Sequence, residues 1–281
     1  MMDVKSYSSN TSPTWCPGCG DYSVLRSLQG AASRLNIEPH RLSVVSGIGC
    51  SGRISGYMNC YGFHSIHGRA LPIAQAIKLV NPSLTVVAAG GDGDGFAIGT
   101  GHSIHAMKRN LDITYIVMNN QVYGLTKGHT SPLSEPGFMS KSTPHGSMEA
   151  PIKPGLLALA AGATFIAQGF VAYQEQLIEL LMKAIQHRGF SFVNVFSPCV
   201  TFNKTNTYEW FRAHLTSLDV HDTSDYQAAM NKYLSTDGLF TGILYENKDG
   251  DNKFHGENEK AVIDEDLNIL DSFDSLLEEF I

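Results

Sequence analysis

The chain has 281 residues, of which 43% are hydrophobic, and it carries a formal net charge of −7. This negative charge, without any basic tract, argues against a nucleic-acid-binding protein. The sequence contains no run of about 18 or more apolar residues, so no membrane-spanning helix is expected. The first 15 residues also lack the apolar segment of a secretory signal, so we expect a cytoplasmic protein with no nucleic-acid or membrane partner.

The first third of the chain alternates helix-like and strand-like segments. Asp21 is placed to cap a helix over residues 23–35, where apolar residues recur with a helical period. The run LSVV, at residues 42–45, predicts a strand that ends in a glycine-rich turn, and residues 57–66 form an aromatic, loop-like segment. Residues 67–82 predict another helix, which ends at an Asn-Pro pair.

The segment GGDGDG, at residues 90–95, follows the apolar, strand-like run LTVVAA. Glycines let the backbone approach a bulky, charged group without a Cβ in the way. A bound diphosphate would be repelled by Asp92 and Asp94, but Mg²⁺ removes the conflict because it takes oxygen ligands from carboxylates, amides and phosphates together. A predicted helix and a second strand then lead to Asn119 and Asn120, which a parallel sheet would bring to the same edge.

Residues 121–155 are rich in Gly, Ser, Thr and Pro. A loop of this length is usually functional, so we expect it to cover the bound group. Two further helix–strand pairs follow, up to FSFVNVFSPC at residues 190–199. The repeated alternation predicts an α/β fold with a doubly wound parallel sheet. We expect one domain over residues 1–205 and an acidic C-terminal extension, residues 206–281, that packs on the domain or on a partner subunit.

Four of the five cysteines stand at a connection or at the end of a predicted strand. Cys16 and Cys19 form a CxxC turn, Cys50 follows LSVVSGIG, and Cys199 follows FVNVFSP. Four thiolates that converge in a reducing compartment suit Zn²⁺ or a [4Fe–4S] cluster, and their spacing alone does not separate the two. Cys60 is expected to be an ordinary buried thiol.

The motif GDG followed, after a helix and a strand, by NN resembles the signature of thiamine diphosphate (ThDP) enzymes. Further motifs, namely WCPGCG, GIGCSGR, HGRALPIAQAIKLVNP, NNQVYGLTKG and SPC, make residues 11–205 similar to the β subunit of 2-oxoacid:ferredoxin oxidoreductases. The resemblance implies a ThDP-binding fold that holds ThDP, Mg²⁺ and one [4Fe–4S] cluster.

The resemblance also implies roles for individual residues. The cluster ligands would be Cys16, Cys19, Cys50 and Cys199. The Mg²⁺ ligands would be Asp92, Asn120 and the carbonyl of Val122. The contacts with ThDP would be Ile48, Gly49, Cys50, Ser51 and His67, with Gly93 and Asp94 at the diphosphate and Gly124 and Leu125 beside the thiazolium. Without the resemblance, a packing or capping role is the alternative for His67.

The implied reaction is the oxidative decarboxylation of a 2-oxoacid with coenzyme A (CoA), which yields acyl-CoA, CO₂ and two reduced ferredoxins. ThDP acts as an electron sink, and a cluster beside it would remove the electrons singly. The resemblance places the glutamate that ThDP enzymes need against the pyrimidine ring on the α subunit, and no glutamate of this chain has a convincing setting. We therefore expect an αβ or (αβ)₂ assembly that is inactive without its α subunit.

The substrate is expected to be 2-oxoglutarate, because Arg53 and Lys127 are two cations that suit its distal carboxylate. The GLTKG segment also resembles the 2-oxoglutarate or broad 2-oxoacid branch. The alternatives are that Lys127 is solvated and that Arg53 pairs with an acid. For the whole chain, the alternatives are a ThDP decarboxylase or synthase without a redox cluster and a zinc-stapled, non-catalytic ThDP-binding subunit.

Overall fold

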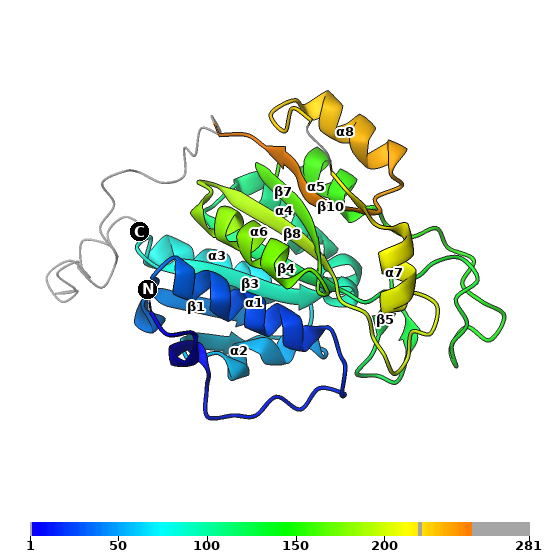
Figure 1. Ribbon diagram of the computed structural model, residues 1–281, viewed down its shortest axis with the longest axis horizontal. Helices are drawn as coiled ribbons and strands as arrows, with labels where there is room; N and C mark the ends of the chain where they lie inside the picture. The colour runs from blue at the N-terminus through cyan, green and yellow to red at the C-terminus, as the bar shows by residue number, and fades with distance from the viewer. Residues whose placement is uncertain (1, 219–220, 249–281) are drawn as a thin grey trace, which may run out of the picture.

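The computed structural model describes residues 2–218 and 221–248. Within these residues an eight-stranded sheet runs through the molecule in the order β2-β1-β3-β4-β8-β7-β10-β9 (Figure 1). The first six of these strands run parallel to one another. The strands are β1 (Leu42–Ser46), β2 (Tyr61–His64), β3 (Thr85–Gly91), β4 (Ile113–Asn119), β7 (Phe165–Phe170), β8 (Phe190–Phe196), β9 (Thr216–Ser217) and β10 (Phe240–Glu246), and β5 (Val122–Tyr123) pairs separately with β6 (His129–Thr130).

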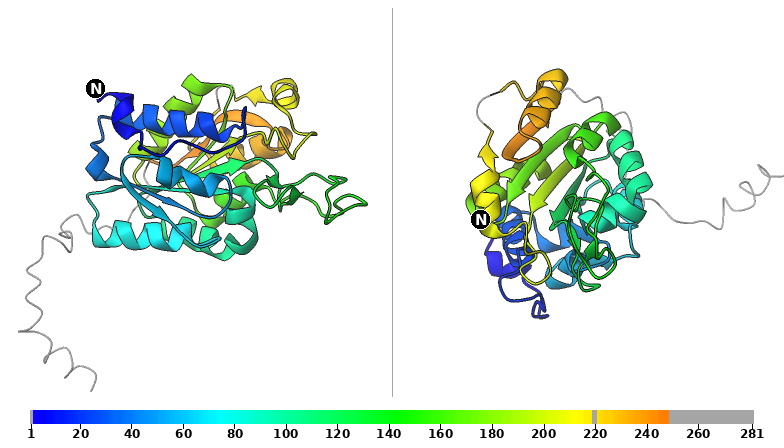
Figure 2. Two further views of the ribbon diagram at one scale, coloured as in Figure 1. Left: turned by 90° about the horizontal axis from the view of Figure 1, so that it is seen from below. Right: turned by 90° about the vertical axis from the view of Figure 1, so that its right-hand side faces the viewer.

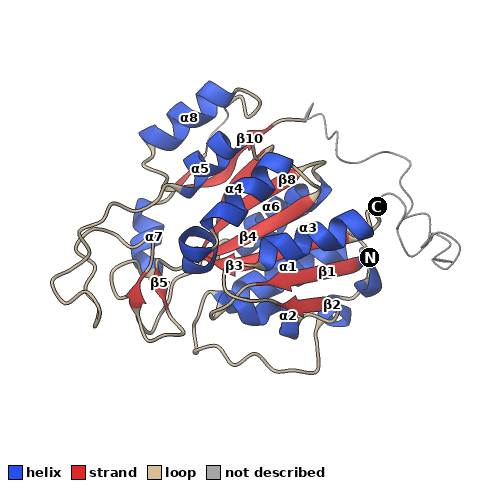
Figure 3. Ribbon diagram, turned by 180° about the vertical axis from the view of Figure 1, so that it is seen from behind, coloured by secondary structure: helices blue, strands red, loops and turns tan. Residues whose placement is uncertain are grey.

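Helices cover both faces of the sheet, as a doubly wound fold requires. One face packs against α1 (Asp21–Arg34), α2 (Ile54–Tyr57), α6 (Gln174–Gln186) and α7 (Tyr208–His214). Seen from behind, the other face is covered by α3 (Ala70–Val80), α4 (Thr100–Arg109), α5 (Pro154–Ala161) and α8 (Tyr226–Ser235) (Figure 3). The central strands are buried on both sides, which explains why they read as continuous apolar runs in the sequence.

The predicted α/β class and the mostly parallel sheet are confirmed. Two local predictions are wrong. Residues 57–66 are not all loop, because β2 forms the edge strand beside β1. Asp21 does not cap α1, whose N-cap is Gly20; the Asp21 side chain is buried in the first turn and accepts a hydrogen bond from Ser197 Oγ at 2.8 Å.

The chain after residue 205 contributes to the sheet. Strand β10 pairs antiparallel with β7, so the sheet is mixed at this end rather than wholly parallel. Helix α8 packs against α5, where the Tyr233 ring occupies the space that a side chain at Gly155 would need. The acidic residues from position 249 onward lie outside the described part of the chain, and a domain boundary at residue 205 stays a prediction.

The register of the parallel strands brings their carboxyl ends to one edge. Gly47 N–H donates to the carbonyl of Ala89, and Ser197 N–H donates to that of Asn119. The turns after β1, β3, β4 and β8 are therefore neighbours, as the sequence predicted for the GDG and NN motifs. None of the described helices has the length and apolar character needed to cross a membrane.

Candidate cofactor site

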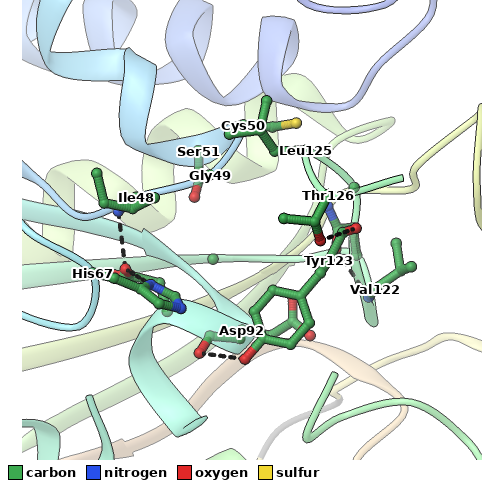
Figure 4. A pocket seen from close by; sticks show the side chains of 15 residues that line it. Ile48, Gly49, Cys50, Ser51, His67, Asp92, Val122, Tyr123, Leu125 and Thr126 are labelled. Carbon is green, nitrogen blue, oxygen red and sulfur yellow. Dashed lines mark hydrogen bonds and ion pairs between the residues drawn. The ribbon is translucent and has the colours of Figure 1, made fainter. Parts of the chain in front are cut away.

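A cavity of about 560 Å³ opens at the carboxyl ends of β1, β3 and β4 (Figure 4). The segments that form it are the turns after these three strands and the His67 turn before α3. Its lining consists of Ile48, Gly49, Cys50, Ser51, His67, Gly91, Asp92, Gly93, Asp94, Asn120, Val122, Tyr123, Gly124, Leu125 and Thr126. The structure thus brings together all the residues that the sequence proposed for ThDP and Mg²⁺.

Asp94 organises the two turns on one side of the cavity. Its Oδ1 accepts hydrogen bonds from Ile48 N–H at 2.9 Å and from Gly68 N–H at 2.8 Å, and it lies 2.7 Å from His67 Nδ1. A Cβ at Gly47 would overlap the Asp94 carboxylate, so the glycine is needed for the close approach. Because one oxygen already serves three groups of the chain, Asp94 acts mainly as a scaffold of the site.

Asp92 is the carboxylate best suited to a cation. It is 1% exposed, and Ser131 Oγ donates a hydrogen bond to its Oδ2. Burial raises the pKa of Asp92 to about 6, and no cationic side chain of the described residues forms an ion pair with it. A buried carboxylate without a counter-charge is costly, and a bound cation removes that cost.

The remaining oxygen donors lie beside Asp92. Asn120 follows β4 and its Oδ1 accepts a hydrogen bond from Val122 N–H at 3.1 Å, so the amide oxygen and the Val122 backbone belong to one tight turn. Carboxylate, amide and carbonyl oxygens are the ligands that Mg²⁺ takes in proteins. These donors fit Mg²⁺, and the open space above Gly49, where a Cβ would meet no atom, fits a bulky group next to it.

Tyr123 and Thr126 line the cavity although the sequence did not single them out. The Tyr123 hydroxyl donates to the carbonyl of Gly93 at 3.1 Å, and a Cβ at Gly93 would overlap its ring. The ring also meets His67 edge-on, with 6.1 Å between centroids. Burial, and after it the two nearby aspartates, raises the pKa of Tyr123. These residues lie in a stretch whose sequence has no helical or strand periodicity, so the sequence does not predict which of its side chains face the cavity.

The long loop divides into two parts. Its first part carries β5, β6 and Ser131 and closes one side of the cavity. Its second part extends away from the body of the molecule (Figure 2), with Met139 71% and Met148 96% exposed. Only the first part therefore borders the cavity, and the expectation that the loop covers the cofactor stays a prediction.

The four cysteines proposed as cluster ligands lie next to the same cavity. A Cβ at Gly124 would be 3.5 Å from Cys199 Sγ and 3.6 Å from Cys50 Sγ. Burial raises the pKa of the Cys50 thiol to about 11, and the neighbouring Asp21, Cys199 and Cys16 act in the same direction. Burial also raises the pKa of Cys19, with further contributions from Asp21, Cys199 and Cys50. The four thiols are therefore electrostatic neighbours.

No single-ion site has formed from these thiols. Among the residues that the structure describes, no three His, Cys, Asp or Glu side chains lie close enough together to hold a metal ion. Cys60 stands apart from this group: it is half-buried against the core, and burial raises the pKa of its thiol to about 12.

Arg53 and Lys127 are not among the residues that line the cavity. The Arg53 guanidinium donates to Thr14 Oγ1 and faces a separate surface cavity that includes Tyr57 and His64. Lys127 is exposed and sits at a backbone φ of 70° in the turn before Gly128. Their proposed roles toward a substrate stay predictions.

Two family models match the chain. Residues 47–195 match the C-terminal TPP-binding domain of thiamine pyrophosphate enzymes, which includes the cavity's three turns. Residues 199–259 match the C-terminal part of the pyruvate ferredoxin oxidoreductase β subunit. The two matches meet near Cys199 and together cover most of the chain.

Relatives with established names agree with these models. The chain is 43% identical over 219 residues to subunit β of 2-oxoacid:ferredoxin oxidoreductase 2 of Aeropyrum pernix, which covers 78% of this chain and 71% of that protein. It is 46% identical over 191 residues to the 2-oxoglutarate synthase subunit KorB of Archaeoglobus fulgidus, which covers 68% and 71% respectively. A solved structure of 2-oxoglutarate:ferredoxin oxidoreductase from Magnetococcus marinus, with 2-oxoglutarate, coenzyme A and succinyl-CoA bound, superposes with a TM-score of 0.86 at 39% identity, over 98% of this chain and 91% of that one. The chain belongs to the β subunits of the 2-oxoacid:ferredoxin oxidoreductases, in the branch whose members include 2-oxoglutarate enzymes.

Proposed function

We propose that this chain holds ThDP, Mg²⁺ and one [4Fe–4S] cluster in an assembly that converts a 2-oxoacid and CoA into acyl-CoA and CO₂ and passes the electrons to ferredoxin. The substrate is 2-oxoglutarate, giving succinyl-CoA. The observation that carries this proposal is the shared wall of the cavity: Cys50 and Asp92 line the same space. A redox-active thiol site and a diphosphate–metal site on one cavity suit a reaction in which electrons leave the cofactor singly.

The chain's own residues have distinct tasks in this proposal. Asp92, Asn120 and the Val122 carbonyl hold Mg²⁺, while Ile48, Gly49 and Ser51 border the cofactor on the opposite wall. ThDP held there would supply the carbanion and the electron sink that decarboxylation of a 2-oxoacid requires. His67 is held through Nδ1 by Asp94, which fixes the ring at the border of the cavity.

The thiol geometry favours a cluster over zinc. Zinc in a tetrahedral site binds sulfur at about 2.3 Å, so its four thiolates nearly touch. No such close group exists among the described residues, although the Cys199 thiol contributes to the raised pKa of both Cys19 and Cys50. A four-iron cluster spaces its thiolates more widely because each one binds a different corner of the cluster. The zinc-stapled subunit and the ThDP enzyme without a cluster remain the alternatives that metal analysis would separate.

The cavity supports the need for an α subunit. No glutamate is found among its lining residues, so the group that must act on the pyrimidine ring has to come from elsewhere. Two of the lining side chains, Ile48 and Leu125, are apolar yet 37% and 49% exposed. Two further apolar side chains, Ile66 beside His67 and Ile98 at the end of the Asp94–Ile98 segment, are 74% and 55% exposed. Such a surface suits burial against a partner subunit.

The test is a coupled assay under anaerobic conditions. The chain alone, the α subunit alone and the reconstituted complex are given ThDP, Mg²⁺, CoA, ferredoxin and one of several 2-oxoacids. We expect ferredoxin reduction only by the complex, fastest with 2-oxoglutarate. Turnover by the isolated chain would contradict the need for an α subunit, and CO₂ release by the complex without ferredoxin reduction would favour the non-redox alternative.

A further inference from the structure

A second cavity lies on the other side of β4. It lies at the carboxyl ends of β4, β8 and β7, and its empty space of about 530 Å³ is partly open to solvent. The two cavities share no lining residue. Asn119 and Gln121 line the second cavity, whereas Asn120, which lies between them in the sequence, lines the cofactor cavity. Its polar side chains include Glu135, Asn194 and Gln168. Nothing in the proposed reaction uses this space.

Asn194 presents an acceptor to this cavity that has no donor. The side chain is 1% exposed in the centre of the sheet, and its Oδ1 has no hydrogen-bond partner. The orientation of the amide is fixed by its neighbour. Gln168 Nε2 donates to the carbonyls of Gly238 and Phe240, so Gln168 Oε1 is the acceptor for Asn194 Nδ2 at 2.9 Å. The free atom of Asn194 is therefore the oxygen.

Two more buried oxygens without donors line the same cavity. Asn119 is 3% and Gln121 is 6% exposed, and Asn119 Oδ1 and Gln121 Oε1 have no partner. Asn194 is paired with Val117 across the sheet, and Asn119 lies two residues further along β4, so both side chains leave the same face. Gln121, at a φ of 57°, turns the chain back toward them. An unpaired buried acceptor is costly, and here three gather in one place.

The charges at the rim decide which ligand suits these oxygens. Lys153 and Asp237 neutralise each other at 2.7 Å, which leaves the half-buried Glu135 as the acid of the cavity. An anion would have to compete with Asp237 for Lys153 Nζ and with Gln168 for Asn194 Nδ2. A divalent cation usually needs several carboxylates to replace its water. A weakly hydrated monovalent cation is satisfied by neutral carbonyl oxygens, as in potassium-selective sites.

We propose that this cavity binds a monovalent cation of the potassium type, with Asn194 Oδ1, Asn119 Oδ1 and Gln121 Oε1 among its ligands and Glu135 balancing its charge. The cation removes the cost of three buried, unpaired oxygens and joins β4 to β8. It also stiffens the segment 119–121, whose middle residue, Asn120, faces the cofactor cavity.

Hydrogen bonds link this site with Asp92. The carbonyl of Gln121 accepts from Ser134 Oγ at 2.6 Å, Ser134 Oγ accepts from the Ser131 N–H at 2.9 Å, and Ser131 Oγ donates to Asp92. A ligand that fixes Gln121 therefore also fixes the donor of Asp92. The consequence is that the cation tightens the cofactor site without touching it.

The test measures binding without turnover, so its outcome is independent of the proposed reaction. The chain is purified with its α subunit in choline chloride, and thermal unfolding is followed while KCl replaces choline chloride at constant ionic strength. We expect the Tm to rise by about 5 °C at saturating K⁺. Asn194→Leu should abolish the rise, whereas Asn231→Ala, on the exposed side of α8, should keep it.

A second variant keeps the test decisive if Asn194→Leu does not fold. Gln121→Glu adds a negative charge to the ligand set and should lower the K⁺ concentration at half-maximal effect by about tenfold. Crystals soaked in RbCl should show an anomalous peak between the three oxygens. Equal Tm in KCl and choline chloride, together with water molecules only in the cavity, would overturn the proposal.

Discussion

Two aspartates separated by one glycine have opposite tasks in the cofactor site. One carboxylate oxygen of Asp94 forms hydrogen bonds with Ile48 N–H, Gly68 N–H and His67, and so joins two turns. Among the described side chains, Ser131 alone donates a hydrogen bond to Asp92, and none supplies a counter-charge. The GDGDG pattern predicted carboxylates near a diphosphate, but it could not tell the scaffold from the proposed metal ligand, because that depends on which loops return to the turn.

The raised pKa of Asp92 predicts a pH dependence of cation binding. The pKa of Asp92 in the folded chain, about 6, exceeds the ordinary value of 3.8. Protonation of Asp92 at low pH therefore stabilises the cofactor-free fold, and this stabilisation is lost as the pH rises through about 6. Mg²⁺ needs the ionised form and has the opposite dependence. We expect the apparent affinity for Mg²⁺–ThDP, measured by calorimetry, to fall about tenfold per pH unit below pH 6.

Asp92→Asn provides the control for this experiment. The amide keeps the shape of the side chain and cannot titrate, so its residual binding should be weak at every pH. An unchanged affinity of the wild type between pH 5 and 7.5 would contradict the assignment of Asp92 as the metal ligand.

Arg53 is predicted to bind the distal carboxylate of 2-oxoglutarate. It follows the Cys50 turn, is exposed, and is held by Thr14 rather than by an acid. If it binds the distal carboxylate, Arg53→Ala should raise the KM of the complex for 2-oxoglutarate by about tenfold and leave the KM for pyruvate nearly unchanged. Arg34→Ala, which breaks an exposed pair with Glu175, is the control. Equal losses for both acids would count against the role.

At the scale of elements, the site depends on turns packed more closely than side chains permit. The GDG turn continues into a π-helical segment, Asp94–Ile98, before α4 begins. A Cβ at Gly47 would overlap Asp94, and one at Gly93 would overlap the Tyr123 ring. The glycines thus serve the contacts between turns of the protein as well as the approach of a cofactor.

A pair of glycine variants tests this packing. Gly47→Ala should lower the free energy of unfolding by about 3 kcal/mol, because the new methyl group meets a carboxylate that is already fixed. Gly101→Ala, in α4 with open space around it, should raise the free energy of unfolding by about 0.5 kcal/mol. Urea unfolding of both variants measures the difference. Equal stability of the two would contradict the tight turn.

The sequence predicted the buried strands well and the exposed or irregular ones poorly. The apolar runs of β3, β4 and β8 are buried on both faces and stand out. Strand β2 is exposed along its whole length at the edge and has no burial pattern to read. Strand β10 contains Gly242 at a φ of 132° and a register shift, so its alternation is broken.

The site follows the same rule. The motif residues of the cofactor cavity could be predicted because their residue types are distinctive. The parallel strands then explain why motifs far apart in the sequence lie at the same edge of the sheet. Tyr123, Thr126 and Ser131 could not be found, because their positions depend on how an aperiodic loop folds back. A signal for the second cavity was present in FVNVF, where Asn194 interrupts a buried strand.

At the scale of the whole molecule, the extension after residue 205 completes the sheet. Phe240 and Leu244 of β10 are 0% exposed, and Phe240 meets Tyr233 of α8 edge-on at 5.8 Å. Without β10, the buried strand β7 would have an open edge. Because this region is polar in composition, the sequence did not predict β10, the strand that covers the edge of β7.

This arrangement predicts that the extension is required for stability. Phe240→Ala should cost about 4 kcal/mol of unfolding free energy because it leaves a cavity at the base of β10. Tyr226→Ala, on an aromatic ring that is 40% exposed, should cost less than about 1 kcal/mol. A chain that ends at residue 205 should not fold. Cooperative unfolding of that shortened chain at the Tm of the full one would show that the extension is dispensable.

Anaerobic visible spectroscopy of the complex tests most directly whether this one small subunit couples a cofactor cavity to an iron–sulfur cluster. The complex should be brown as purified, and adding 2-oxoglutarate and CoA should bleach the cluster absorbance within one turnover. Cys199→Ser should remove the colour and leave ThDP binding in place. A colourless wild-type complex with stoichiometric zinc, or a brown one that 2-oxoglutarate and CoA do not bleach, would contradict the account.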